Sequence, residues 1–252
     1  MEAKKRTKVR IQADLTLLLA AIVWGGGFIA QRIATRYLGV FSFNGIRFVL
    51  AGLLLLPFAL KSLKKIDRKL LWILPAGVLL FGGSALQQAG IATTTAGAAG
   101  FITGVYVVLV PLFLALIWRE KIPAVNWIAA LAALGGTYLL STGGQEVRPG
   151  SGDLLVLAGS VVWAFHVIVV GLAVRELDTL VFSVGQFLLC GLINLIFGHF
   201  ICPLSWTAVQ PAIPSLLYAG VFSVAIGFTL QALGQSKAPT TDAVLIMSLE
   251  SV

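Results

Sequence analysis

Long apolar segments occupy most of this chain and constrain its fold more than any other feature. Eight of them hold 18 to 24 residues with few charges, and a ninth holds ten. About 20 helical residues, at 1.5 Å each, span the ~30 Å hydrocarbon core of a bilayer. We therefore expect membrane spans at Leu15–Ala34, Val40–Leu60, Leu70–Ile91, Ala96–Trp118, Ala124–Ser141, Leu154–Val174, Leu180–Pro203 and Ile213–Gly234, and an incomplete one at Ala243–Val252.

Composition and segment length together decide between helix and strand. Hydrophobic residues make up 58% of the chain and charged residues 11%, whereas about a quarter of a soluble domain is charged. A membrane β-barrel would show segments of about ten residues with alternating polarity. Because backbone buried in lipid must hydrogen-bond within its own segment, the long segments predict an all-α membrane protein.

The chain carries one pattern twice. Asp14 precedes Trp24 by ten residues, and Asp153 precedes Trp163 by the same interval. Residues 86–90 (Leu-Gln-Gln-Ala-Gly) are echoed by 230–234 (Leu-Gln-Ala-Leu-Gly), and threonines follow both. The duplication predicts a first repeat over residues 1–142, with five helices, and a second over 153–252. Duplication of this kind is typical of transporters.

The net charge of +8 belongs to the membrane topology and does not indicate a nucleic-acid partner. Lys and Arg gather in alternate loops, which predicts a cytoplasmic N-terminus; the opposite side holds Arg32, Arg36 and Arg148. Residues 61–69 carry five Lys and Arg, and the corresponding loop near 205–212 carries none. Similar helices with opposite loop charge indicate two repeats that cross the membrane in opposite directions.

The ninth segment is about half the length needed to cross. Its counterpart in the first repeat continues to Trp118 and precedes a fifth helix. We therefore expect a ten-helix fold that is truncated within helix nine, with helix ten missing.

Several motifs resemble those of EamA-type members of the drug/metabolite transporter superfamily. They occur in order at 24–32 (Trp-Gly-Gly-Gly-Phe-Ile-Ala-Gln-Arg), 43–48 (Phe-Asn-Gly-Ile-Arg-Phe), 86–90, 99–111, 152–155, 163–166, 230–231 and 248–252. The resemblance implies two inverted five-helix repeats and secondary transport of small organic solutes, as an exporter or exchanger, by alternating access. It also implies a multi-pass protein of a bacterial-type inner or plasma membrane, whose partners are the lipid bilayer and a small-molecule substrate.

Burial of a charged or titratable side chain at bilayer depth costs free energy, so each such residue is a candidate for a functional role. Arg47 is expected either to attract an anionic group of a substrate in a central cavity or to extend toward the headgroups. Glu250 is expected to be a protonatable coupling site, a partner for a basic residue, or a structural group. His166 is either a proton relay or a neutral histidine that is hydrogen-bonded between helices.

Amides and aromatics at membrane depth form a second group of candidates for the substrate pathway. Gln87, Gln88 and Gln231 would lie near the axis that relates the repeats, where they bind substrate or join helices. Aromatic rings there either stack on a substrate or pack against a helix. The remaining candidates of these kinds are Asn44, Gln186, Trp24, Trp163 and Tyr106.

Small residues and a proline are candidates for close helix packing or bending. Gly100 and Gly104 form a small-residue stripe that lets another backbone approach. Bends are expected where helices are interrupted by glycine or proline; these sites are Gly25, Gly26, Gly27 and Pro111.

No catalytic constellation, cofactor motif or metal-ligand spacing is visible in the sequence. We therefore expect a protein that is not an enzyme and that uses no cofactor, metal or nucleic acid. Two alternatives stay open: a membrane-embedded enzyme acting on a lipid or isoprenoid, and a membrane protein that does not transport. The sequence also leaves open whether the chain forms a homo-oligomer.

Overall fold

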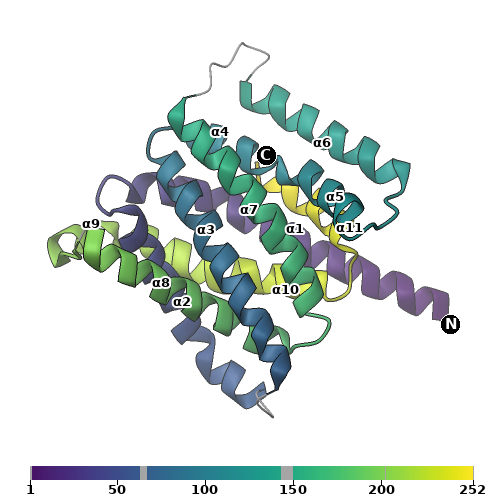
Figure 1. Cartoon of the computed structure of the whole chain (residues 1–252), viewed down its shortest axis with the longest axis horizontal. Helices are drawn as coiled ribbons and strands as arrows, with labels where there is room; N and C mark the ends of the chain where they lie inside the picture. The colour runs from purple at the N-terminus through teal and green to yellow at the C-terminus, as the bar shows by residue number, and fades with distance from the viewer. Residues whose placement is uncertain (1, 63–66, 143–149, 202, 252) are drawn as a thin grey trace.

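The structure is a computed structural model that describes residues 2–62, 67–142, 150–201 and 203–251. Arg148 and Val252, which the sequence assigned to a loop and to the last span, lie outside these residues. All of the secondary structure that it describes is helical, and it forms one bundle (Figure 1). In chain order the elements are α1 (Glu2–Ala34), α2 (Val40–Ser62), η1 (Arg68–Trp72), α3 (Ile73–Ile91), α4 (Ala96–Thr103), α5 (Tyr106–Leu116), α6 (Ala124–Thr142), α7 (Ser151–Ala173), α8 (Thr179–Ile201), α9 (Trp206–Leu217), η2 (Tyr218–Phe228), α10 (Thr229–Gln235), α11 (Thr240–Met247) and η3 (Ser248–Ser251).

The polarity of the bundle is that of a membrane protein. Leu15, Ile22 and Ile29, seven residues apart on α1, are each more than half exposed, whereas polar side chains such as Asn44 and His166 are fully buried. Within the described residues, seven helical segments are long and apolar enough to cross a membrane, and Ala124–Leu140 is a shorter apolar helix. Apolar surface outside and polar groups inside fit a lipid solvent.

Several helix bounds differ from those expected from the sequence. α1 begins at Glu2 and not at Leu15, because polar residues before the apolar run continue the helix outward. The eighth span begins at Trp206, so residues 206–212, expected in a loop, are helical. From Tyr218 to Phe228 this span is a π-helix.

The fourth span is interrupted, but not at Pro111. Its helix breaks between Thr103 and Tyr106, where Val105 N donates to Ile102 O at 3.2 Å in a tight turn. Pro111 lies inside the helix that follows. α1 likewise runs through Gly25, Gly26 and Gly27 without a break. The break thus occurs at glycine 104 and valine 105, which are weak helix formers.

The third span of each repeat contacts the first helix of the other repeat, and the two contacts are alike. A Cβ on Gly83 of α3 would lie 3.0 Å from the indole of Trp163, and one on Gly227 of η2 would lie 2.5 Å from the indole of Trp24. Both glycines precede the repeated glutamines, Gln87 and Gln231, by four residues. α3 therefore packs on α7 as η2 packs on α1, so helices at corresponding positions of the two sequence repeats make corresponding contacts.

The second helices of the two repeats, α2 and α8, pack closely against each other. A Cβ on Gly191 of α8 would lie 2.8 Å from Val49 N of α2. Because backbone atoms cannot give way as a side chain can, only glycine allows this approach. The contact holds Arg47, two residues before Val49, in the interior of the bundle.

Candidate functional site

A cavity lies in the interior between the repeats and encloses about 520 Å³ of space, its open mouth included. It is bordered by α1 to α5 of the first repeat and by α7, η2, α10 and η3 of the second. The lining residues are Trp24, Phe28, Gln31, Arg47, Gln87, Thr103, Tyr106, Trp163, His166, Val167, Ser223, Phe228, Gln231 and Glu250.

One face of α1 supplies Trp24, Phe28 and Gln31, which are spaced four and three residues apart and so lie on the same side of a helix. The indole Nε1 of Trp24 donates to Ser223 O at 3.0 Å. Phe28 and Gln31 are not among the residues expected from the sequence. The helical spacing from Trp24 is the signal that identifies them.

Arg47 is the charged group of this cavity that has no acidic partner. Its guanidinium carbon lies 5.1 Å from the ring centre of Phe43 and 4.9 Å from that of Phe48. The ion pairs that the structure describes involve neither Arg47 nor Glu250. Its Nε makes no hydrogen bond to the described residues. Among the described residues, the contacts found for this positive charge in the cavity wall are the two aromatic rings.

The second repeat has a glutamine where the first has this arginine. Residues 43–48 correspond to 182–187 (Phe-Ser-Val-Gly-Gln-Phe), which pairs Arg47 with Gln186. Gln186 does not line the cavity; its Oε1 accepts from His166 Nε2 at 2.9 Å. His166 therefore sits hydrogen-bonded between α7 and α8, while its Nδ1 makes no hydrogen bond to the described residues.

The repeated glutamines occupy equivalent places in the cavity wall. Gln87 Nε2 donates to Thr103 Oγ1 at 3.0 Å, and Gln231 Nε2 donates to Gln235 Oε1 at 2.9 Å. Gln88 is not among the lining residues and donates to Gln31 O at 3.2 Å. Of the expected amides, the structure thus brings Gln87 and Gln231 to the site and leaves Gln88 as a link between α1 and α3.

Tyr106 and Glu250 come from different repeats and are neighbours in the wall. Tyr106 begins α5, directly after the break in the fourth span, and Glu250 lies in η3. Both side chains are buried. Asn44, the last of the expected pathway residues, is fully buried but outside the lining.

Phe228, which the sequence did not single out, joins the aromatic rings of the site. Its ring centre lies 4.8 Å from that of Trp24, 5.7 Å from that of Trp163 and 6.0 Å from that of His166. These distances are typical of interacting aromatic pairs. Phe228 of η2 therefore contributes an apolar surface to the cavity and contacts aromatic side chains of α1 and α7.

The small residues on α1 and α4 pack against the end of the second repeat. A Cβ on Gly25 would lie 3.1 Å from Glu250 O, and one on Gly26 would collide with the hydroxyl of Tyr218. Gly27 faces Ser223 in the same way. Gly100 and Gly104 both lie within 3.7 Å of Ser251, measured from the Cβ that each lacks. Gly25, Gly26 and Gly27 thus allow η2 and η3 to approach α1, whereas the distances to Ser251 are ordinary contacts.

Many polar atoms of the lining are buried without a hydrogen bond to the described residues. They include Gln31 Oε1, Arg47 Nε, Trp163 Nε1, His166 Nδ1 and Gln231 Oε1. A buried polar atom left unpaired costs about 1–3 kcal/mol. Such atoms gathered around one cavity, with aromatic rings between them, are typical of a site for a small polar or amphipathic ligand. The described residues contain no group of three or more His, Cys, Asp and Glu side chains suited to a metal ion.

Comparison with protein families gives the same match in both halves of the chain. The model of the EamA-like transporter family matches residues 11–142 and again residues 150–252. The helices that border the cavity lie within these two matches.

Individual relatives carry transporter names. An "Uncharacterized transporter" of Archaeoglobus fulgidus is 31% identical over 244 residues, which cover 96% of this chain and 76% of the relative. The "Uncharacterized transporter YvbV" of Bacillus subtilis is 28% identical, over 90% of this chain and 78% of its own. A solved crystal structure is similar in fold, with a TM-score of 0.76 and 20% identity over 95% of this chain and 84% of that one.

Proposed function

We propose, starting from the membership of this chain in the EamA-like transporter family, that it is a secondary transporter of small organic metabolites or amphipathic compounds. It acts as an exporter or exchanger in a bacterial-type inner or plasma membrane, with its N-terminus in the cytoplasm. Membership of this family supports a multi-pass membrane transporter in general. The cargo class and the site are inferred from the cavity.

The observation that carries the proposal is the set of unpaired polar atoms around the cavity. Arg47 supplies a positive charge without an acidic partner, so it receives an anionic group of the cargo, such as a carboxylate. The rings of Trp24, Trp163 and Phe228 receive an apolar part. Gln31 and Gln231 offer amide oxygens to a hydrogen-bond donor. A cargo with one anionic and one apolar end satisfies these groups together.

The position of the cavity between the repeats supports alternating access. Its wall is shared by both repeats, so a movement of one repeat against the other changes which end of the cavity is open. The break beside Tyr106 and the π-helix beside Phe228 place irregular backbone at the cavity, where it is tolerated in membrane proteins. The proposal assigns no chemistry to the site beyond binding and release.

A ligand screen on the purified protein tests the binding site. Small organic anions and amphipathic compounds are added one at a time, and the melting temperature is measured in detergent, because a ligand of the folded state raises it. Arg47→Gln should abolish the rise that the best compound gives. Arg36→Gln, which changes an exposed arginine on the connection after α1, is the matched control and should retain it. Equal stabilisation of both variants would contradict contact between Arg47 and the cargo.

A further inference from the structure

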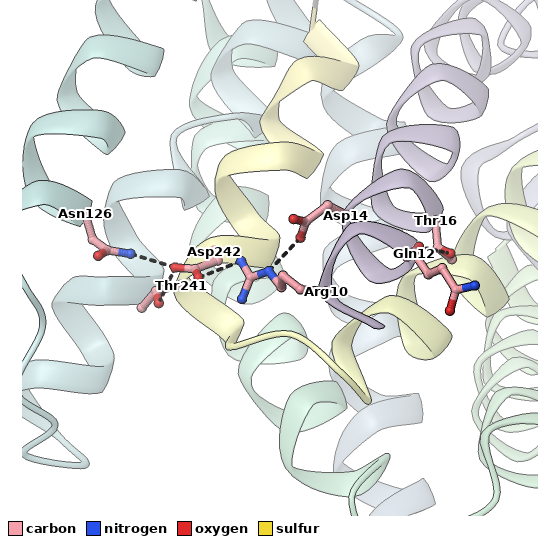
Figure 2. A network of polar contacts seen from close by, with 7 residues as sticks. All are labelled: Arg10, Gln12, Asp14, Thr16, Asn126, Thr241 and Asp242. Carbon is pink, nitrogen blue, oxygen red and sulfur yellow. Dashed lines mark hydrogen bonds and ion pairs between the residues drawn. The ribbon is translucent and has the colours of Figure 1, made fainter. Parts of the chain in front are cut away.

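A polar cluster joins the two repeats at the end of the bundle where α1 begins (Figure 2). Arg10 of α1 donates through Nε to Asp14 Oδ1 at 2.9 Å and through NH2 to Asp242 Oδ2 at 2.7 Å. The other oxygen of Asp242 accepts from Asn126 Nδ2 of α6 at 2.8 Å. Asp242, in the first turn of α11, thus holds two helices of the first repeat at once.

This cluster lies far from the cavity along the helix axis. Trp24, the first cavity residue on α1, follows Arg10 by fourteen residues, or about 21 Å at 1.5 Å per residue. The intervening layer is packed: Ala13, Leu17 and Ala243 are buried, and a Cβ on Gly234 would lie 2.5 Å from Leu17 Cγ. α1, α10 and α11 are therefore packed against one another between the cavity and the cluster.

At the equivalent place in the second repeat, the described residues form no ion pair. Asp153 corresponds to Asp14, since each precedes its tryptophan by ten residues. Asp153 accepts from the Thr94 hydroxyl and, at 2.8 Å, from Gly150 N. Both donors are neutral. Both ion pairs that the structure describes belong to Arg10, and one of them, with Asp242, joins the two repeats.

We propose that Arg10, Asp14, Asn126 and Asp242 form a latch that holds this end of the transporter closed. The inference rests on the proposed function, because alternating access requires α11 to separate from α1 and α6 at this end. Separation must break the Arg10–Asp242 ion pair and the Asn126–Asp242 hydrogen bond together. The latch therefore favours the state in which the cavity opens at the opposite end.

Cysteine labelling measures opening at this end without any cargo. Ala13→Cys, in a background with both native cysteines replaced by serine, reports on the buried layer through its rate of modification by a soluble maleimide in detergent. Asp242→Asn and Arg10→Gln should each raise that rate about three- to fivefold, the effect of losing one partly exposed ion pair. The exchange of charges, Arg10→Asp with Asp242→Arg, should restore the slow rate.

Two controls separate the latch from a general loosening of the fold. Asp153→Asn removes the corresponding charge at the opposite end and should leave the labelling of Ala13→Cys unchanged. Gly97→Cys, whose Cβ meets open space, should label equally fast in every variant. In the chain with an intact latch, about 1 M salt should speed the labelling of Ala13→Cys by screening the pair, and it should not do so after Asp242→Asn.

Unchanged labelling in Asp242→Asn, or a charge exchange that labels as fast as the single variants, would overturn the latch. Because this assay needs no cargo, it fails independently of the proposed function. If the substitutions change the labelling rate but the protein transports no compound, the result supports the latch and contradicts the proposed transport. If the protein transports a compound but substitution of Arg10 and Asp242 leaves the labelling rate unchanged, the result supports transport and contradicts the latch.

Discussion

Replacing Arg47 with methionine tests whether this residue binds a ligand or stabilises the fold. A charge at the bilayer centre costs about 2.5–3.5 kcal/mol on insertion scales. The two aromatic contacts of Arg47, with Phe43 and Phe48, offset about 0.5–1 kcal/mol each. About 0.5–2.5 kcal/mol of unfavourable energy, centred near 1.5, remains, because no ion pair of the described residues involves this guanidinium.

Methionine has a similar length and no charge, so Arg47→Met should raise the free energy of unfolding by about 0.5–2.5 kcal/mol. The same change should remove binding of an anionic cargo. Denaturant titration in mixed micelles measures the first effect, and ligand-induced stabilisation measures the second. Arg36→Met, at an exposed position, should change the stability by no more than about 0.5 kcal/mol. A loss of stability in Arg47→Met would refute this reasoning, since it would mean that the guanidinium supports the fold.

Two further substitutions test the packing around the site. Gln186→Leu should lower the free energy of unfolding by about 1–3 kcal/mol, because it leaves His166 Nε2 buried without its acceptor; unchanged stability would mean that another group takes over the bond. Gly191→Ala should destabilise by about 1–3 kcal/mol, because the added Cβ meets Val49 N at 2.8 Å. Gly135→Ala, where a Cβ meets nothing within 4 Å, should instead stabilise α6 by about 0.5–1 kcal/mol; equal effects of the two alanines would contradict the close contact of α2 and α8.

The sequence predicted the helical fold well because the length of an apolar run reports directly on the width of a bilayer. It placed helix ends less well. α1 extends thirteen residues before its apolar run, since a polar sequence can continue a helix outside the membrane. The interruption in the fourth span was expected at Pro111 and lies at Gly104 and Val105, because where a helix breaks depends on the neighbours that satisfy its backbone.

The charged residues of the site and two of its amides were predictable, whereas its phenylalanine and valine residues were not. Arg47, Gln87 and Glu250 stand out because a polar group at bilayer depth is costly, and the structure places all three in the cavity wall. Phe228 and Val167 look like any other apolar residue of a membrane helix, and only the arrangement of the helices gives them a place there. Neither a run length nor a repeat pattern encodes which side of a helix faces a cavity.

Counterflow in proteoliposomes tests most directly whether the cavity between the repeats binds the transported compound. Vesicles that contain the purified chain are loaded with the compound that raises its melting temperature most, and uptake of the labelled compound from outside is followed. Uptake is expected from the wild-type chain and from Arg36→Gln, whereas Arg47→Gln should show uptake at the level of protein-free vesicles. Equal uptake by the two variants would contradict the assignment of the cavity between the repeats as the cargo site.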